Sequence, residues 1–587
     1  MRVLKLLKRA GRIYIILIVF FALIFSVTPS ISVLIMKEII NTLQISMSSF
    51  SYIFKLLIIY IFIDVVQAFT YLFSQYCESK FQMKGSLIIN MSILEKVKEF
   101  SLQDFEDSET YDLLKRAMKV DFTRIFSFFK SFVLLIQSSI NIILFATIVI
   151  SWKWWIIPII LIIPLINTIF TAYFGKKQFL IIKNRAGKER KSWYYQYLLT
   201  NDIAFKEIKI FNLGEYLRNR YKKLYKQFID QDINILNKRT KTQTFLLVLE
   251  EIINSLILIF IILKAFMGEI LLGDLNTYTR SISSVKSYTQ NFLGQINLIY
   301  ENVLYIGQYF EFINKTCSSE ILEVEGEQTE ENFCTISSIE IKNLAYKYEG
   351  QNHYALKELN LKIEGNSLVA FIGVNGSGKS TLVKILSTLY QDYQGDIFFG
   401  EHELKTLKLH DVREKIGILY QDFVRYELSA RENIVFGSLS KLENSSEIEK
   451  IINNVGLKKR INDLDMQLGF WFDDGVQLSG GEWLKVALGR AFIRDAELYI
   501  LDEPNASLDA ISEKTILKAF KELVKGKIGI VVSHRIASIK DIVDKMVVFH
   551  NGSIEAIGSH EELLIKSRTY KELFYDEIAE NQSSNIS

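Results

Sequence analysis

Long apolar runs dominate the chain up to about Phe312 and are rare after it. A helix that crosses ~30 Å of hydrocarbon needs about 20 mostly apolar residues. Six stretches fit this length, at residues 13–36, 52–76, 128–150, 154–174, 244–266 and 277–312. The sixth is the most polar and suits a helix that faces a water-filled path, because it carries Arg280, Lys286, Gln290, Asn291, Gln295, Asn297 and Glu301. The pattern predicts a membrane α-helical bundle of six transmembrane helices.

The segments between these runs orient the bundle. Short links with few positive charges alternate with two long segments, 77–127 and 175–243, which are rich in Lys and Arg and have a helical pattern. Positively charged segments tend to stay on the cytoplasmic side of a membrane. We therefore expect helices that continue beyond the lipid bilayer into the cytoplasm, and both termini on the cytoplasmic side of the plasma membrane. The first run is too long for a signal peptide and lacks a cleavage site, so it is expected to remain as a helix.

A polar second domain follows the bundle. The transmembrane domain is expected at residues 1–314, and the acidic segment 315–337 indicates a linker. Residues 338–570 alternate strand-like and helical segments, which predicts an α/β domain. Residues 571–587 are expected to form a polar C-terminal tail.

Composition narrows the function classes. Hydrophobic residues make up 49% of the chain, which is too apolar for an ordinary soluble enzyme. The net charge of +3 gives no reason to expect a nucleic-acid partner. The cysteines Cys77, Cys317 and Cys334 lack the spacing of metal ligands, so free thiols in a reducing compartment are expected.

The strongest candidate chemistry lies in the run GVNGSGKST, which matches the phosphate-loop pattern G-x-x-x-x-G-K-[ST]. The run follows a strand-like segment, 368–372, and precedes a helix start at 382–386. Backbone N–H groups of such a loop close around phosphate oxygens at a helix N-terminus. Lys379 can reach the outer phosphates, and the Ser380 hydroxyl can bind Mg²⁺. The sequence thus predicts a P-loop nucleotide site built from Gly373, Val374, Asn375, Gly376, Ser377, Gly378, Lys379, Ser380 and Thr381.

Two carboxylates end a second apolar strand, LYILDE at residues 498–503. An apolar strand that ends in two acidic residues places a carboxylate beside a nucleotide bound to the phosphate loop. Asp502 is the expected acid on the metal side. Glu503 is then expected to polarise the attacking water, which is the general-base task in phosphoanhydride hydrolysis.

A second glycine-rich anion site, LSGGE at residues 478–482, opens another helix. With this motif, residues from about Ser338 to Leu564 resemble the nucleotide-binding domain of an ABC transporter, and the six spans resemble the membrane half of an ABC exporter. The resemblance implies an ATPase that uses ATP and Mg²⁺ and couples hydrolysis to transport. It also implies a second copy of the chain, because the family needs two of each domain. A homodimer is expected, and a heterodimer is the alternative.

The resemblance also implies roles for residues outside the phosphate loop. Tyr348 would stack on adenine, Gln421 would contact Mg²⁺ together with Ser380 and Asp502, and His534 would contact the γ-phosphate as a catalytic switch. The remaining matches are Ser479, Gly480 and Gly481, which would close over the γ-phosphate held by the other subunit, and Asp509, in the loop that joins the two sites. The chain departs from the family pattern at Glu482, Asn505 and Asp473.

A narrower resemblance concerns the cargo. The stretches that start at Gln421 and Leu468, and the helical segments that start at Glu109 and Ala204, look most like bacterial exporters of lantibiotics and other bacteriocin peptides. Related exporters move drugs or lipids, so a multidrug exporter or lipid flippase stays the alternative. No Cys or His precedes the first span, so leader cleavage by this chain is not expected.

Two other classes fit less well. A soluble ATPase of the same nucleotide-binding type that acts on DNA would not carry six apolar runs. A non-transporting membrane regulator would be expected to lose Glu503 or the LSGGE signature, and the chain keeps both.

Overall fold

The computed structural model describes residues 2–45, 50–118, 120–316, 335–504 and 510–584. The chain divides into two compact units. One comprises Met1–Val97 and Asp112–Lys315, and the other comprises Lys98–Tyr111 and Thr316–Ser587. Most of the predicted linker at 315–337, with Cys317 and Cys334, lies outside the described residues.

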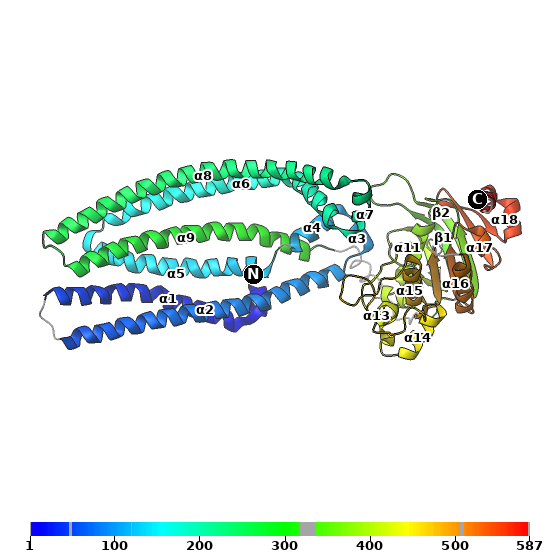
Figure 1. Cartoon of the computed structure of the whole chain (residues 1–587), viewed down its shortest axis with the longest axis horizontal. Coiled ribbons are helices and arrows are strands. Elements are labelled where there is room, and N and C mark those ends of the chain that lie inside the picture. The colour runs from blue at the N-terminus through cyan, green and yellow to red at the C-terminus, as the bar shows by residue number, and fades with distance from the viewer. Residues whose placement is uncertain (1, 46–49, 119, 317–334, 505–509, 585–587) are drawn as a thin grey trace. The chain divides into compact units, whose positions relative to one another are not determined.

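The first unit is built from long helices (Figure 1). They are α1 (Arg2–Ile45), α2 (Phe50–Lys98), α5 (Phe122–Lys153), α6 (Ile156–Thr200), α8 (Leu213–Phe266) and α9 (Leu272–Ile313), joined in part by α4 (Ser108–Met118) and α7 (Asp202–Ile210). Among the described residues, five of these helices are long and apolar enough to cross a membrane, namely α1, α2, α5, α6 and α8. The sixth predicted span lies within α9, which is 42 residues long but too polar to meet the same criterion, and its role as a span stays a prediction.

Several helices are far longer than a bilayer requires. α2, α6 and α8 contain 49, 45 and 54 residues, against about 20 for one crossing. The predicted extension of the spans beyond the bilayer agrees with these lengths. α1 is interrupted at Gly11, whose φ of 149° sets a basic N-terminal segment apart from the apolar span that follows.

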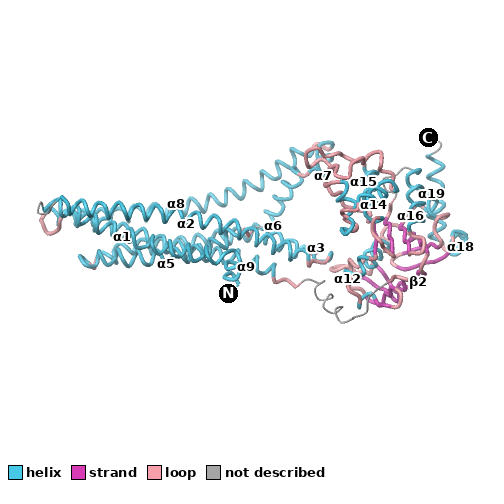
Figure 2. Tube along the Cα trace, turned by 90° about the horizontal axis from the view of Figure 1, so that it is seen from below, coloured by secondary structure: helices cyan, strands magenta, loops and turns pink. Residues whose placement is uncertain are grey.

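The helices of this unit pack as neighbours along their lengths. α5 lies along α9, and α6 lies along α8 (Figures 1 and 2). Five of the helices contribute to one apolar core, which consists of Val33, Phe145, Val149, Ile156, Ile160, Ile257, Ile261, Ile282 and Val285. Beside this core the ring of Trp152 stacks on that of Tyr278 with centroids 4.5 Å apart, so α5 and α9 are locked together by both aliphatic and aromatic contacts.

The second unit contains two sheets within its described residues. The larger has the strand order β10-β9-β3-β8-β7-β6 and the smaller β2-β1-β4-β5. The larger sheet comprises β3 (Ser367–Ile372), β6 (Ile416–Leu419), β7 (Leu498–Asp502), β8 (Ile528–Val532), β9 (Lys545–His550) and β10 (Ser553–Gly558). Only its β9–β10 pair is antiparallel. The smaller, antiparallel sheet comprises β1 (Ser338–Tyr346), β2 (Leu356–Glu364), β4 (Gln394–Phe399) and β5 (His402–Glu403).

Helices cover the parallel sheet, as expected for strands that are apolar on both faces. Every residue of β7 and β8 is buried. The helices of this unit are α3 (Leu102–Glu106), α11 (Lys379–Leu386), α12 (Leu409–Glu414), α13 (Ala430–Val435), α14 (Ser445–Asn454), α15 (Gly480–Phe492), α16 (Ala510–Leu523), α17 (Ile536–Ile539), α18 (His560–Lys566) and α19 (Arg568–Ser584). The α/β architecture predicted for this domain is therefore confirmed.

The C-terminal segment differs from the expected polar tail. Residues 568–584 form α19, and Phe574 and Ile578 pack against the apolar core of the second unit. Glu577 accepts hydrogen bonds from the backbone N–H groups of Ile536 (2.7 Å) and Ala537 (3.1 Å), at the start of α17. The segment is polar in composition, but Phe574 and Ile578 are four residues apart and so lie on one side of the helix. These two side chains attach α19 to the core.

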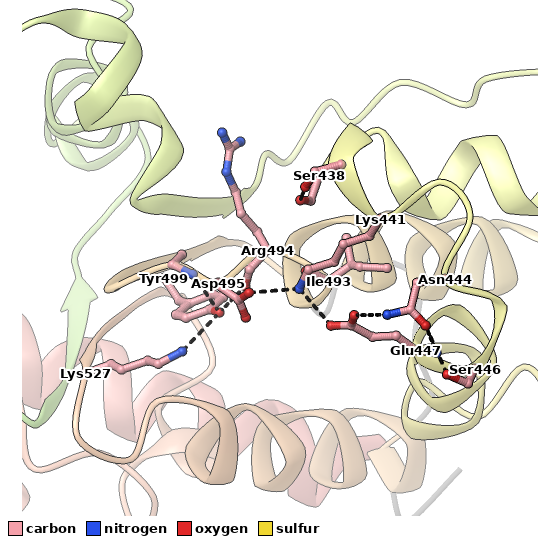
Figure 3. Close-up of polar contacts among 12 residues, drawn as sticks. Ser438, Lys441, Asn444, Ser446, Glu447, Ile493, Arg494, Asp495, Tyr499 and Lys527 are labelled. Atoms are coloured by element: carbon pink, nitrogen blue, oxygen red, sulfur yellow. Dashed lines mark hydrogen bonds and ion pairs between the residues drawn. The ribbon is translucent and has the colours of Figure 1, made fainter.

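A polar network contacts the C-terminal end of α15, the helix that begins within the LSGGE signature (Figure 3). Lys441 Nζ donates to the Ile493 carbonyl at the end of α15 (2.8 Å) and to Glu447 Oε1 on α14 (2.7 Å). It also lies 3.0 Å from Asp495 Oδ2. Lys441 thus joins α14 to the C-terminal end of α15.

Candidate functional site

The predicted motifs meet at one edge of the parallel sheet. β3, β8, β7 and β6 are consecutive parallel neighbours, so their carboxyl ends lie together, where open α/β sheets bind ligands. These ends lead into the phosphate loop, His534, Asp502 with Glu503, and Gln421. A cavity of about 1040 Å³ is lined by all nine phosphate-loop residues, Gly373 to Thr381, and by Tyr348, Gln421, Glu503 and His534.

The phosphate loop adopts a shape that requires glycine. Gly378, the N-cap of α11, has a φ of 105°, and a Cβ there would lie 2.6 Å from Leu356 Cδ2 and 2.9 Å from the Ala355 carbonyl. Such a position tolerates no side chain. The loop therefore presents its backbone at the N-terminus of α11, which is the arrangement that binds phosphate.

Lys379 lies inside this loop. Its side chain is buried, and its Nζ donates to the carbonyls of Gly373 (2.8 Å) and Val374 (3.0 Å). Burial lowers the pKa of Lys379, while the carboxylates of Glu503 and Asp502 oppose that shift. The ammonium group is thus held by carbonyl oxygens within a site that favours anionic phosphate.

Asp502 fits the role of a metal-side acid. It is buried, its Oδ1 has no hydrogen-bond partner among the described residues, and the Ser380 hydroxyl bonds to its carboxylate. Burial and, after it, the nearby Glu503 carboxylate raise the pKa of Asp502 to about 6. Carboxylate, hydroxyl and amide oxygens are the ligands that Mg²⁺ takes. Ser380, Gln421 and Asp502 therefore suit a Mg²⁺ ion that accompanies the nucleotide phosphates.

This pKa gives a testable pH dependence. A proton and a metal ion compete for the same carboxylate, so acidification through about pH 6 should weaken metal binding, because the folded protein protonates Asp502 there rather than near 3.8. We expect the affinity of the nucleotide-bound protein for Mn²⁺, a spectroscopic substitute for Mg²⁺, to fall by about tenfold per pH unit below this point. Electron paramagnetic resonance titration between pH 5 and pH 7.5 measures it.

The nucleotide phosphates also take up protons in this range. The same titration with Asp502→Asn supplies the control, because that variant retains only the phosphate contribution. Equal pH dependence in the two proteins would contradict the assignment of Asp502.

Glu503 is held in a strained conformation beside the loop. Its backbone φ of 50° is rare for a residue other than glycine. Its N–H donates to the Val532 carbonyl (3.0 Å). Its carboxylate accepts a hydrogen bond from Gln421 Nε2 (2.5 Å) and lies 3.9 Å from His534 Nδ1. Backbone strain of this kind collects at functional sites. The geometry places the carboxylate between the two polar side chains that sequence analysis assigned to the same site.

An aromatic cluster links Tyr348 to α3. The Tyr348 hydroxyl lies 3.0 Å from Thr381 Oγ1, and its ring meets those of Tyr346 and Tyr390 edge to face. The Tyr390 hydroxyl donates to Glu106 Oε1 (2.9 Å), at the end of α3. Burial, followed by this hydrogen bond, raises the pKa of Tyr390. A displacement of α3 would therefore shift Tyr390 and, through it, Tyr348, the side chain predicted to stack on adenine.

The LSGGE signature lies elsewhere in the second unit. Ser479 caps α15, its side chain accepts from Glu482 N, and the Glu482 carboxylate accepts a hydrogen bond from Ser479 N (2.8 Å). The Glu at this departure from the family pattern therefore completes a capping box. The phosphate loop lines a cavity to which Ser479, Gly480 and Gly481 do not contribute. Asp509 and Asn505 lie outside the described residues, and Asp473 is exposed.

Sequence reasoning missed some residues of the cavity. His353, Lys357, Asn551 and Gly552 also line it. Asn551 and Gly552 form the turn between β9 and β10 with positive φ values of 47° and 84°, and Gly552 N donates to the Ser377 carbonyl (3.1 Å). An Asn-Gly pair between two strands is a strong hairpin signal, so the turn was predictable, although its contact with the loop was not.

Known proteins resemble this chain both in sequence and in fold. The family profile described as ABC transporter matches residues 356–506. The chain is 35% identical over 558 residues to the subtilin transport ATP-binding protein SpaT of Bacillus subtilis, covering 94% of this chain and 90% of that protein. It is also 35% identical over 578 residues to the nisin transport ATP-binding protein NisT of Lactococcus lactis subsp. lactis, covering 98% and 95%. A solved bacterial Atm1-family ABC exporter with ATP bound has the same fold, with a TM-score of 0.74 at 17% identity over 97% of this chain and 98% of that one.

The fold and the site define an ATP-binding transporter in which a helical membrane domain and an α/β ATPase domain share one chain. The chain belongs to the ABC transporter family. It is an exporter whose ATPase activity is coupled to transport, so the family resemblance seen in the sequence is confirmed.

Proposed function

We propose that this protein exports a modified peptide of the lantibiotic type across the bacterial cytoplasmic membrane, with both termini and the ATPase domain in the cytoplasm. The carrying observation is the extent of the similarity to the subtilin and nisin transport proteins, which covers 94% and 98% of the chain. ABC ATPase domains are shared by exporters of unrelated cargo, so similarity confined to that domain would say little about the substrate. Here the similarity also covers the membrane helices.

The functional unit in this proposal is a dimer of two copies of the chain. The cavity of one chain contains the phosphate loop, Gln421, Glu503 and His534, but not Ser479, Gly480 or Gly481. The signature at the N-terminus of α15 is itself an anion-binding element. A second copy would supply it across the bound nucleotide, so that each ATP is enclosed by two chains.

Each residue of the nucleotide site has a separate role in ATP binding or hydrolysis. Tyr348 holds adenine, and Lys379 and the loop N–H groups hold the phosphates. When Mg²⁺ is bound, by Ser380, Gln421 and Asp502, it neutralises phosphate charge. Glu503 orients the attacking water and takes its proton. His534, on the other side of the Glu503 carboxylate, contacts the γ-phosphate.

Transport follows from closure of the two ATPase domains around ATP. The long helices α2, α6 and α8, each more than twice the length that one crossing needs, would carry this closure into the membrane. The membrane domain then opens to the outside, and hydrolysis resets it.

The test is ATP-dependent accumulation of a leader-bearing, lanthionine-bridged peptide in inside-out membrane vesicles. We expect uptake with the wild-type chain and none with Glu503→Gln. No uptake by the wild type, with ATPase activity stimulated instead by lipids or hydrophobic drugs, would replace the peptide proposal with the multidrug or lipid alternative.

A further inference from the structure

A group of charged and polar side chains lies between α8 and α9, inside the membrane unit. Lys286 Nζ on α9 lies 3.0 Å from Glu251 Oε1 and 3.5 Å from Glu250 Oε1, both on α8. Gln290 Nε2 donates to Glu250 Oε1 (3.1 Å). Lys286 therefore bridges two carboxylates, and the three ionisable groups carry a net charge of −1 when all are ionised.

The two carboxylates are not equivalent. Glu250 is closed in by Lys286 and Gln290, and only 12% of its side chain is exposed. Glu251 shares Lys286, but 60% of its side chain remains exposed. Glu251 is therefore the carboxylate of the pair that an incoming cation can reach.

Glu251 lies at a depth where hydrocarbon would be expected. It follows the start of the apolar run 244–266 by seven residues and precedes its end by fifteen, which are about 10 Å and about 22 Å at 1.5 Å per residue. Ionisable side chains at such depth face the bundle interior or a water-filled cavity rather than lipid. Glu251 is therefore expected to face the interior of the bundle or water rather than lipid.

A cavity opens beside this carboxylate. It has a volume of about 330 Å³ and is lined by both helices. Its lining combines Glu251 and Lys286 with the hydroxyl side chains of Ser255, Thr279, Ser283 and Ser287 and with aliphatic residues such as Ile261. Its size is near the lower limit of ligand pockets, so it suits one side chain or end group of a larger molecule rather than a whole peptide.

We propose that this cavity binds an ammonium or guanidinium group of the transported molecule, and that Glu251 is the anion that receives it. The incoming cation would replace Lys286 at Glu251, while Lys286 keeps its contact with Glu250, so one cation is exchanged for another without leaving a bare carboxylate in the membrane. That the bearer of the cation is a peptide rests on the proposed function. The charge preference itself rests only on the cavity.

The test uses the full-length protein in inside-out vesicles and one lysine-containing, lanthionine-bridged peptide in two forms, native and with its amines acetylated. The wild type is expected to accumulate the native form about tenfold better than the acetylated form, and Glu251→Gln to remove most of that preference while uptake of the acetylated form is unchanged. Glu269→Gln is the matched control, because Glu269 pairs with Lys264 near the C-terminal end of α8. Basal ATPase activity should be the same in all three proteins.

Two outcomes would overturn the site. One is equal loss of both peptide forms in Glu251→Gln, and the other is an unchanged preference. If the wild type accumulates neither form, stimulation of its ATPase activity by benzylammonium is compared with that by neutral benzyl alcohol. Stimulation by the cation alone, abolished in Glu251→Gln, keeps the cation site and removes the peptide proposal, whereas no difference between the two probes removes the site as well.

Discussion

Replacement of Glu503 by Gln should reduce ATP turnover by about 10²- to 10⁴-fold, the range attributed to a positioned general base. The amide keeps the size of the side chain and its place between Gln421 and His534, but it cannot accept a proton from water. Nucleotide binding should persist, because the phosphate contacts come from the loop and from Lys379. Phosphate release measures the first effect, and equilibrium titration with ATP measures the second.

The control for this variant is Glu522→Gln, which removes a carboxylate that pairs with Lys525 at the surface. Its turnover should equal that of the wild type. We also expect Glu503→Gln to accumulate as an ATP-bound dimer, since closure needs ATP but reopening needs hydrolysis. Turnover by Glu503→Gln at the wild-type rate would show that another group activates the water.

The chemical core of the site was predictable because its motifs are local in sequence. The phosphate loop and the Asp502-Glu503 pair each follow a buried strand within a few residues. Parallel pairing of β3, β8, β7 and β6 then brings their carboxyl ends to one edge, whatever the rest of the chain does. The local motifs and the parallel pairing of these strands are thus enough to bring the phosphate loop, Asp502 and Glu503 together.

Other parts of the structure depend on contacts that sequence patterns do not encode. α3 spans five residues, too short for a helical period, although Ser101 and Asp104 form the capping box that marks its start. Its partner Tyr390 lies 284 residues from Glu106. The pairing of Glu251 with Lys286 also joins two helices. The sequence reveals that both charges lie in apolar runs, but not that they neutralise each other.

Replacement of Lys379 by Met should weaken ATP binding by about 30- to 4,000-fold. Truncation of one partner of a buried, hydrogen-bonded charge pair costs about 2–5 kcal/mol, and each 1.4 kcal/mol is about tenfold in affinity. Met fills most of the volume of the buried Lys379 side chain, so the loop should keep its shape. Isothermal titration calorimetry with ATP, ADP and AMP measures the change.

The comparison among nucleotides separates a phosphate contact from a folding defect. Lys379 is predicted to reach the outer phosphates, so ATP and ADP should lose affinity while AMP, held by Tyr348 and the base of the loop, should bind as it does to the wild type. Lys362→Met is the matched control, because Lys362 is an exposed residue of β2 that pairs with Glu364. A uniform loss for all three nucleotides in Lys379→Met would mean that Lys379 supports the loop rather than the phosphates. In that case its hydrogen bonds to the Gly373 and Val374 carbonyls would be its principal role.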